Sequence, residues 1–151
     1  MNRGDWQRLL HIQTYCHDIA RFIDRFGDSY ETFTQDRAYF SAVSMCILQI
    51  GELANGLSDE FRDQTKAEVP WGPIRGMRNW LAHAYAEMDE SVIWETATND
   101  IPKLAAFCQK HIEQDRQTAQ EKPSVLAQLK DVQAKQPPRK QSSPKKQNRE
   151  R

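Results

Sequence analysis

Apolar residues recur at three- and four-residue intervals over the first 114 residues, which is the spacing of amphipathic helices. A first helix is expected from near Asp5, a suitable N-cap, to Phe26, because Gly27 then ends it. Residues 28 to 35 are polar with two aromatics and indicate a connecting loop. A second helix is expected from Asp36 to Leu57. The pattern predicts an all-α fold.

Local signals place the remaining helices. Ser58 to Lys66 predicts a short capped helix, and the sequence Pro70-Trp71-Gly72-Pro73 predicts a turn. A further helix should begin near Ile74 and end around Met88. Asp89 can then cap a fourth main helix that continues to about Gln114 and is bent by Pro102 inside it.

The helix expected from Ile74 to Met88 separates into two surfaces when its residues are placed about 100° apart. An arc of roughly 120°, the width of a core-facing stripe, is predicted to be buried; it holds Ile74, Met77, Trp80, Leu81, Ala84 and Met88. The other surface carries Arg78 with Tyr85, then Arg75, then Asn79 stacked on His83. From their spacing alone, these side chains either form an ordinary solvated face or bind one phosphate together. The second alternative has a chemical basis, since the surface supplies cations, an imidazole that titrates near neutrality and hydrogen-bonding groups.

The second helix holds two residues that bear on this surface. Gly51 costs on the order of 1 kcal/mol relative to alanine inside a helix, so it either permits a close approach by another helix or is simply tolerated. Glu52 is either solvated or orients Arg78 or His83 across a helix interface. The sequence leaves both pairs of alternatives open.

Charge is distributed unevenly although the formal net charge is zero. Residues 120 to 151 carry nine basic and three acidic side chains, or 9 − 3 = +6, so residues 1 to 119 carry 12 − 18 = −6. We expect a domain over residues 1–114 and a largely disordered tail rich in Pro, Gln and Lys over residues 115–151, with a short helix at 124–135. Any nucleic acid must therefore be bound by a local basic site or by the tail.

The cysteines and the absence of a long apolar run favour a cytoplasmic protein without a membrane segment. Cys16, Cys46 and Cys108 are odd in number, lie far apart and fall in apolar helical patterns, so they are expected to be buried thiols. No apolar run approaches the roughly 20 residues of a membrane span. The chain also lacks the closely spaced Cys, His or carboxylate groups of a metal site, and His11, His17 and His111 are scattered.

An ordered set of residues around the Arg and His resembles the HepT-like branch of the HEPN superfamily. The set comprises Val69-Pro70-Trp71, Ile74, Met77-Arg78-Asn79, His83, Tyr85, Asp89, Trp94 and Ile101-Pro102-Lys103-Leu104, with Ile50-Gly51-Glu52-Leu53-Ala54 upstream. The family's shared motif is an Arg, four to six residues, and a His; here four intervene. The likeness covers about residues 5 to 113 and implies an up-and-down bundle of four main helices plus a short one.

The resemblance implies a toxin that cleaves RNA without a metal or other cofactor. The RNA's own 2′-hydroxyl would attack the adjacent phosphate, leaving a cyclic phosphate, while His83 moves the proton and Arg78 stabilises the growing charge. Asn79 and Arg75 would position the substrate. Because one chain offers one such His, and because HEPN ribonucleases generally pair their motifs in one cleft, a homodimer with a composite site is expected.

The resemblance also implies a partner, a minimal nucleotidyltransferase antitoxin of the MntA type that neutralises the toxin by adding AMP to the motif tyrosine. The matching residue is Tyr85, whose alternative role is that of an amphipathic aromatic at a helix end. A different function remains open, a non-catalytic subunit that binds a nucleotide or a nucleotidyltransferase. The tail has no counterpart in the family; it either recruits RNA, folds back on the acidic body or keeps the protein soluble.

Overall fold

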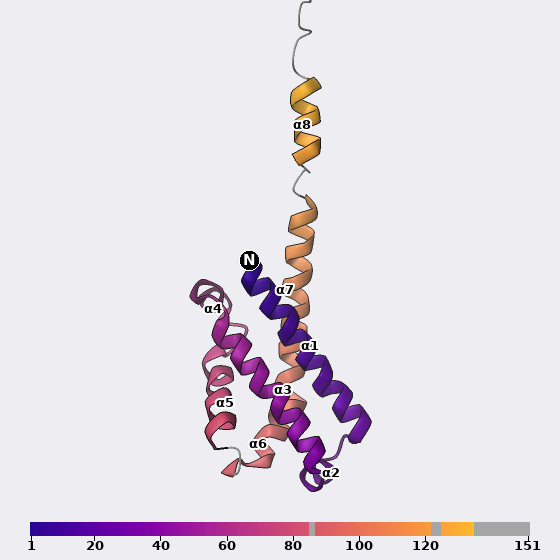
Figure 1. The fold of residues 1–151 in the computed structure, drawn as a ribbon, viewed down its shortest axis with the longest axis vertical. Helices are drawn as coiled ribbons and strands as arrows, with labels where there is room; N and C mark the ends of the chain where they lie inside the picture. The colour runs from indigo at the N-terminus through magenta and orange to yellow at the C-terminus, as the bar shows by residue number, and fades with distance from the viewer. Residues whose placement is uncertain (85–86, 122–124, 135–151) are drawn as a thin grey trace, which may run out of the picture. The chain divides into compact units, whose positions relative to one another are not determined.

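The computed structural model describes residues 1–84, 87–121 and 125–134, and these form helices joined by short connections, without a strand (Figure 1). The predicted all-α fold is confirmed. The elements are α1 (Arg3–Phe26), α2 (Tyr30–Gln35), α3 (Arg37–Gly56), α4 (Asp59–Thr65), α5 (Trp71–His83), α6 (Glu90–Glu95), the π-helical turn η2 (Thr96–Asp100), α7 (Ile101–Glu121) and α8 (Val125–Ala134).

The helix α3 lies between α1 and α5 and contacts both (Figure 1). Its buried side chains, with those of α1 and α7, form most of one continuous apolar core. The fully buried members of this core are Leu9, Ile12, Ile19, Phe33, Tyr39, Val43, Ala54, Ile93 and Cys108. The apolar stripes expected for the first two helices therefore face inward, as amphipathic periodicity requires.

The beginning of α1 differs from the expected one. Asn2, not Asp5, caps the helix, and its side chain accepts a hydrogen bond from the Asp5 backbone N–H at 2.8 Å. Asp5 is 1% exposed and accepts hydrogen bonds from the backbone N–H and the hydroxyl of Ser58, at 2.8 Å and 2.6 Å. The expected cap was wrong because the Asp5 carboxylate binds Ser58, which lies 53 positions later in the chain.

Residues 30 to 35 form the helix α2, so the loop expected over residues 28 to 35 was wrong in this part. Ser29 caps α2 by accepting from the Thr32 backbone N–H. Phe33, which is fully buried, packs edge-on against Tyr39 with ring centroids 5.1 Å apart. Six residues are too few to show helical periodicity. The helix is held against the core by the buried ring of Phe33, and its Tyr30 ring lies 6.3 Å from that of Trp94.

The helix α5 begins and ends earlier than expected. It starts at Trp71, and Pro73 lies in its first turn, where a missing N–H costs no helical hydrogen bond. It ends at His83 instead of Met88, since the backbone of Ala84, with φ −128° and ψ 25°, is no longer helical. Asp89 has extended backbone and caps α6 through the Ser91 N–H. The caps expected at Ser58 and Asp89 are both confirmed.

The fourth main helix is interrupted close to Pro102. Residues Thr96–Asp100 form the wider π-helical turn η2, and regular helix resumes at Ile101. The missing N–H of Pro102 accounts for a disturbance in the preceding turn. Regular helix then continues to Glu121, beyond the expected end near Gln114. The division at residue 114 stays a prediction, and most of the tail lies outside the described residues.

The cysteines Cys16, Cys46 and Cys108 are free and buried, as expected. Burial raises the pKa of the Cys46 thiol to about 11 and that of Cys108 to about 12. Within the described ranges, no single helix is long and apolar enough to cross a membrane. The pair α3 and α4 passes this test by length and composition, but it is bent by 107° at its break.

Candidate functional site

The candidate site lies on α5, which carries four of the five residues singled out in the sequence. Arg75 and Arg78 are half-buried, whereas Asn79 and His83 are exposed. The residues share one helix of 13 residues, so their spacing is fixed by helical geometry. Tyr85, the fifth residue, lies outside the described residues. A surface of α5 therefore presents two cations, an amide and an imidazole.

An ion pair between α3 and α5 fixes Arg78. Its Nε–H donates to a carboxylate oxygen of Glu52, and the two side chains are 35% and 46% exposed. An ion pair this exposed adds little stability by itself, but it restricts where the guanidinium can lie. Of the two roles left open for Glu52, orientation of Arg78 is the one observed.

A second contact repeats this arrangement one helical turn away. The Nε–H of Arg75 donates to the side-chain oxygen of Asn55 at 3.0 Å. Asn55 follows Glu52 by three residues on α3, and Arg75 precedes Arg78 by three on α5. Both arginines are thus held through Nε alone in the part of the chain that the structure describes, which leaves their terminal nitrogens to bind a phosphate.

Gly51 explains how α3 and α5 come close enough for these contacts. A Cβ added at Gly51 would lie 2.9 Å from the Cβ of Arg78 and 3.2 Å from the carbonyl oxygen of Ile74. Any larger residue would therefore push α5 away. Of the two alternatives left open for Gly51, the close approach of another helix is the one observed, and it occurs beside Arg78.

His83 is the last residue of α5 and is exposed. The carbonyl of Trp80, one turn earlier, still accepts a hydrogen bond from the Ala84 N–H at 2.8 Å, so the helix is regular up to this point. Among the described residues, the side chains of His83 and Asn79 make no hydrogen bond. Their side chains are therefore available to a ligand from solvent.

One residue of the expected buried stripe is on the surface instead. Trp80 is 50% exposed, whereas Leu81 is 5% exposed and Ile74 and Met77 are partly buried against the core. Trp80 stood at the edge of the predicted arc, and the observed stripe is narrower because α5 packs on one side only. The indole accordingly lies close to the polar surface that holds His83.

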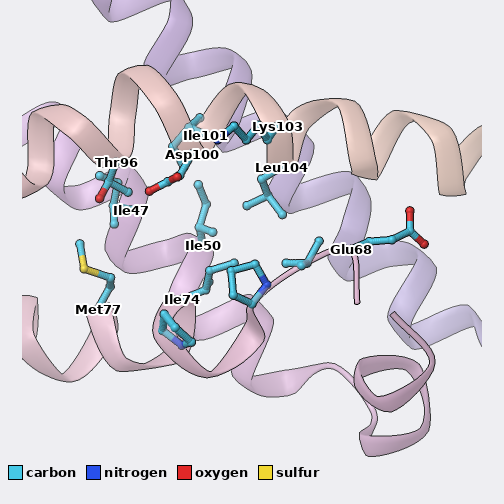
Figure 2. A pocket seen from close by; sticks show the side chains of 13 residues that line it. Ile47, Ile50, Glu68, Ile74, Met77, Thr96, Asp100, Ile101, Lys103 and Leu104 are labelled. Atoms are coloured by element: carbon cyan, nitrogen blue, oxygen red, sulfur yellow. The ribbon is translucent and has the colours of Figure 1, made fainter. Parts of the chain in front are cut away.

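A largely apolar cavity of about 270 Å³ lies on the other side of α5 (Figure 2). Ile74 and Met77 reach it from α5. Residues of α3, η2, α7 and the connection between α4 and α5 complete its wall, among them Ile47, Ile50, Glu68, Ile101 and Leu104. None of the four motif residues that the structure describes lines it. The candidate site is therefore the open surface of α5 rather than this cavity.

The remaining histidines do not join the site. His11 and His17 are exposed on α1, and His111 lies 3.5 Å from a Glu68 carboxylate oxygen while packing against Phe107. A hydrogen bond from Lys110 lowers the pKa of Glu68, with a smaller contribution from His111. Across residues 1–84, 87–121 and 125–134, no three His, Cys, Asp or Glu side chains gather as metal ligands would.

Sequence reasoning missed one residue of this arrangement. Asn55 was not singled out in the sequence, and its hydrogen bond to Arg75 was not expected. The available signal was the spacing, because residues three apart on one helix can face two residues three apart on another. Which of the two arginines Glu52 would contact depended on the helix register.

Comparison with known proteins gives a consistent picture. A family model described as "Ribonuclease HepT-like" matches residues 12–111. The chain is 35% identical over 96 residues to "Putative RNase TTE0752" of Caldanaerobacter subterraneus, a match covering 64% of this chain and 83% of that protein. It is 32% identical over 101 residues to "Probable ribonuclease HepT" of Thermococcus cleftensis, covering 64% and 91%. No solved structure matches. The family match includes Arg75 to His83 and ends before the tail.

Proposed function

Because this chain belongs to the HepT-like ribonuclease family, we propose that it is a metal-independent endoribonuclease whose active site is the surface of α5. The observation that carries the proposal is the juxtaposition of an oriented Arg78 with an exposed His83 on one helix. The substrate is RNA, since the reaction uses its 2′-hydroxyl as the nucleophile.

The proposed step is an internal transfer at phosphorus. The 2′-oxygen forms a bond to the adjacent phosphorus while the bond to the 5′-oxygen breaks, which gives a 2′,3′-cyclic phosphate and a free 5′-hydroxyl. An imidazole takes the 2′-hydroxyl proton, and a proton is delivered to the leaving oxygen. The terminal nitrogens of Arg78 donate to the phosphoryl oxygens, whose charge grows in the transition state. Asn79 and Arg75 hold the phosphate in place.

Two imidazoles are needed if one accepts a proton while another donates one. Each chain supplies a single His at this surface, so we propose a two-fold dimer in which two copies of α5 line one cleft. Pooling the arginines would also oppose the charge of −6 carried by residues 1 to 119.

Mixed dimers test this arrangement. Chains with His83→Ala, carrying a separate affinity tag, are combined with wild-type chains and the heterodimers are isolated. A shared cleft predicts that heterodimers cleave RNA much more slowly than half of the wild-type rate. A rate of one half, as for two independent sites, would contradict it. Arg78→Lys provides a second variant, because lysine keeps the charge and loses the two-nitrogen fork.

We further propose that the protein is a cytoplasmic toxin neutralised by a minimal nucleotidyltransferase that adds AMP to Tyr85. Added phosphates near Arg78 would occupy its guanidinium and repel RNA. The free, buried thiols agree with a reducing compartment. Mass spectrometry of the protein coexpressed with the transferase should show the added mass on Tyr85. Tyr85→Phe should escape neutralisation, while Tyr30→Phe, which changes an exposed tyrosine on α2, should not.

A second function is favoured by the Glu52 contact, since a partly neutralised Arg78 on an acidic domain is a weak general binder of RNA. In this alternative the α5 surface binds a nucleotide or the transferase without catalysis. Growth arrest that disappears with His83→Ala supports the ribonuclease. Arrest that persists in a folded, soluble His83→Ala protein supports sequestration of a partner.

A further inference from the structure

Trp80 is a large aromatic side chain left half-exposed beside the proposed active site. It is 50% exposed, although it belongs to a helix whose opposite side is packed into the core. Trp71 packs against Phe107 with ring centroids 5.7 Å apart, Trp94 packs against Phe33 at 5.1 Å, and Trp6 is partly buried against the core. Trp80 makes no ring contact within the described part of the chain. A single exposed apolar side chain is ordinary on a protein surface, so the meaning of Trp80 depends on the groups beside it.

Trp80 lies next to the residues to which the proposed cleavage reaction is assigned. It precedes His83 by three residues, so the two side chains lie about one helical turn, or roughly 5 to 6 Å between Cβ atoms, apart on the same exposed side of α5. Asn79 is its immediate neighbour. A nucleotide whose phosphate contacts His83 or Asn79 would therefore bring its base to the indole.

The charges at the site provide limited affinity for RNA, so another interaction should contribute to binding. Arg78 is paired with Glu52, Arg75 is bonded to Asn55, and the domain around them is acidic. Stacking between a base and an aromatic ring does not depend on charge and tolerates any sequence. It does require an accessible base face, which a base inside a duplex does not offer.

We propose that Trp80 stacks on an unpaired nucleobase next to the scissile phosphate and thereby restricts the substrate to single-stranded RNA. The inference rests on the proposed function, since it assigns a base contact to the same site. It adds a specificity residue and a substrate class to the Arg and His of the motif.

A binding experiment distinguishes contacts to bases from contacts to phosphates. The full-length protein is titrated with a 12-nucleotide single-stranded DNA, which cannot be cleaved because it lacks the 2′-hydroxyl, and with an abasic strand of equal length and charge. Wild type should bind the base-containing strand about 5- to 100-fold more tightly. Trp80→Ala should bring this ratio near 1 without weakening abasic binding, and Trp80→Phe should retain part of it. Met45→Ala removes a similarly exposed apolar side chain from α3 and should leave the ratio unchanged.

Fluorescence and sedimentation identify the contact. Adding the base-containing strand should quench tryptophan emission in wild type and not in Trp80→Phe. Equal ratios in wild type and Trp80→Ala would overturn the proposal. Conversion of a wild-type dimer to monomers by Trp80→Ala would also overturn it, because a second copy of the chain would then cover the indole.

Cleavage assays distinguish failure of this inference from failure of the proposed function. If wild type cleaves RNA but shows no preference for bases over abasic sugars, the ribonuclease proposal stands and the stacking role is wrong. If wild type shows the Trp80-dependent preference but does not cleave, the stacking contact stands and the catalytic proposal is wrong. Preferential cleavage of single strands that Trp80→Ala loses supports both.

Discussion

Replacing Gly51 with alanine tests whether close contact between α3 and α5 organises the site. The added Cβ would meet the Arg78 Cβ at 2.9 Å, the Ile74 carbonyl oxygen at 3.2 Å and the Arg78 backbone nitrogen at 3.3 Å. Two of these three atoms belong to the backbone and none is the end of a flexible side chain. The helices must therefore separate by some tenths of an ångström, at a typical overpacking cost of about 1 to 3 kcal/mol.

Gly76→Ala is the matched control, since it introduces the same methyl group into α5. A Cβ there meets nothing within 4 Å. Alanine should stabilise this exposed helical position by roughly 0.5 to 1 kcal/mol through helix propensity. Both substitutions gain propensity, so the difference between them isolates the clash. Gly51→Ala should be less stable than Gly76→Ala by about 1 to 3 kcal/mol.

Urea unfolding at a fixed protein concentration measures this difference. With a slope of about 2 kcal/mol per molar, a gap of about 2 kcal/mol separates the two midpoints by about 1 M. Cleavage of a fluorescent RNA, measured where both variants are folded, should fall in Gly51→Ala because Arg78 moves away from Glu52. Equal midpoints for the two variants would refute the reasoning, since the glycine would then be replaceable.

Three further outcomes follow from buried and paired groups. Asp5→Ala should lower the free energy of unfolding by roughly 2 to 3 kcal/mol in urea titrations, because the Ser58 N–H loses its buried acceptor. Cys108, whose pKa burial raises to about 12, should resist iodoacetamide at pH 8 until the protein unfolds; rapid alkylation of native protein would contradict its burial. Lys110 lowers the pKa of Glu68, so their pair stabilises the fold at neutral pH and loses this effect as pH falls through the lowered pKa. The small thermal destabilisation caused by Lys110→Met should therefore be present at pH 7 and vanish in acid.

Features set by neighbouring residues were predictable from the sequence. The caps at Ser58 and Asp89 depend on hydrogen bonds to backbone within three residues, and both formed. The exception was Asp5, which has the chemistry of a cap but bonds to distant Ser58. The helix α2 was missed for the same reason, since its anchor Phe33 contacts rings far along the chain.

The site was predictable as a set of residues but not as a geometry. Helical periodicity placed Arg78, Asn79 and His83 on one surface, because that depends on α5 alone. It could not tell that Trp80, at the margin of the apolar stripe, is half-exposed. Nor could it give the pairing of Arg78 with Glu52 and of Arg75 with Asn55, which depends on the register between α3 and α5.

The helix α5, which carries the motif, has few local features that stabilise helical structure. Pro70 provides no side-chain cap to α5, and Gly72 and Gly76 both face open space. Since glycine disfavours helix, α5 should open locally more often than α3, and its backbone amides should exchange with deuterium sooner. Bound RNA should suppress this local opening of α5. Deuterium exchange that slows only in α5 when RNA is added would then map the binding surface in the wild-type protein, without any substitution.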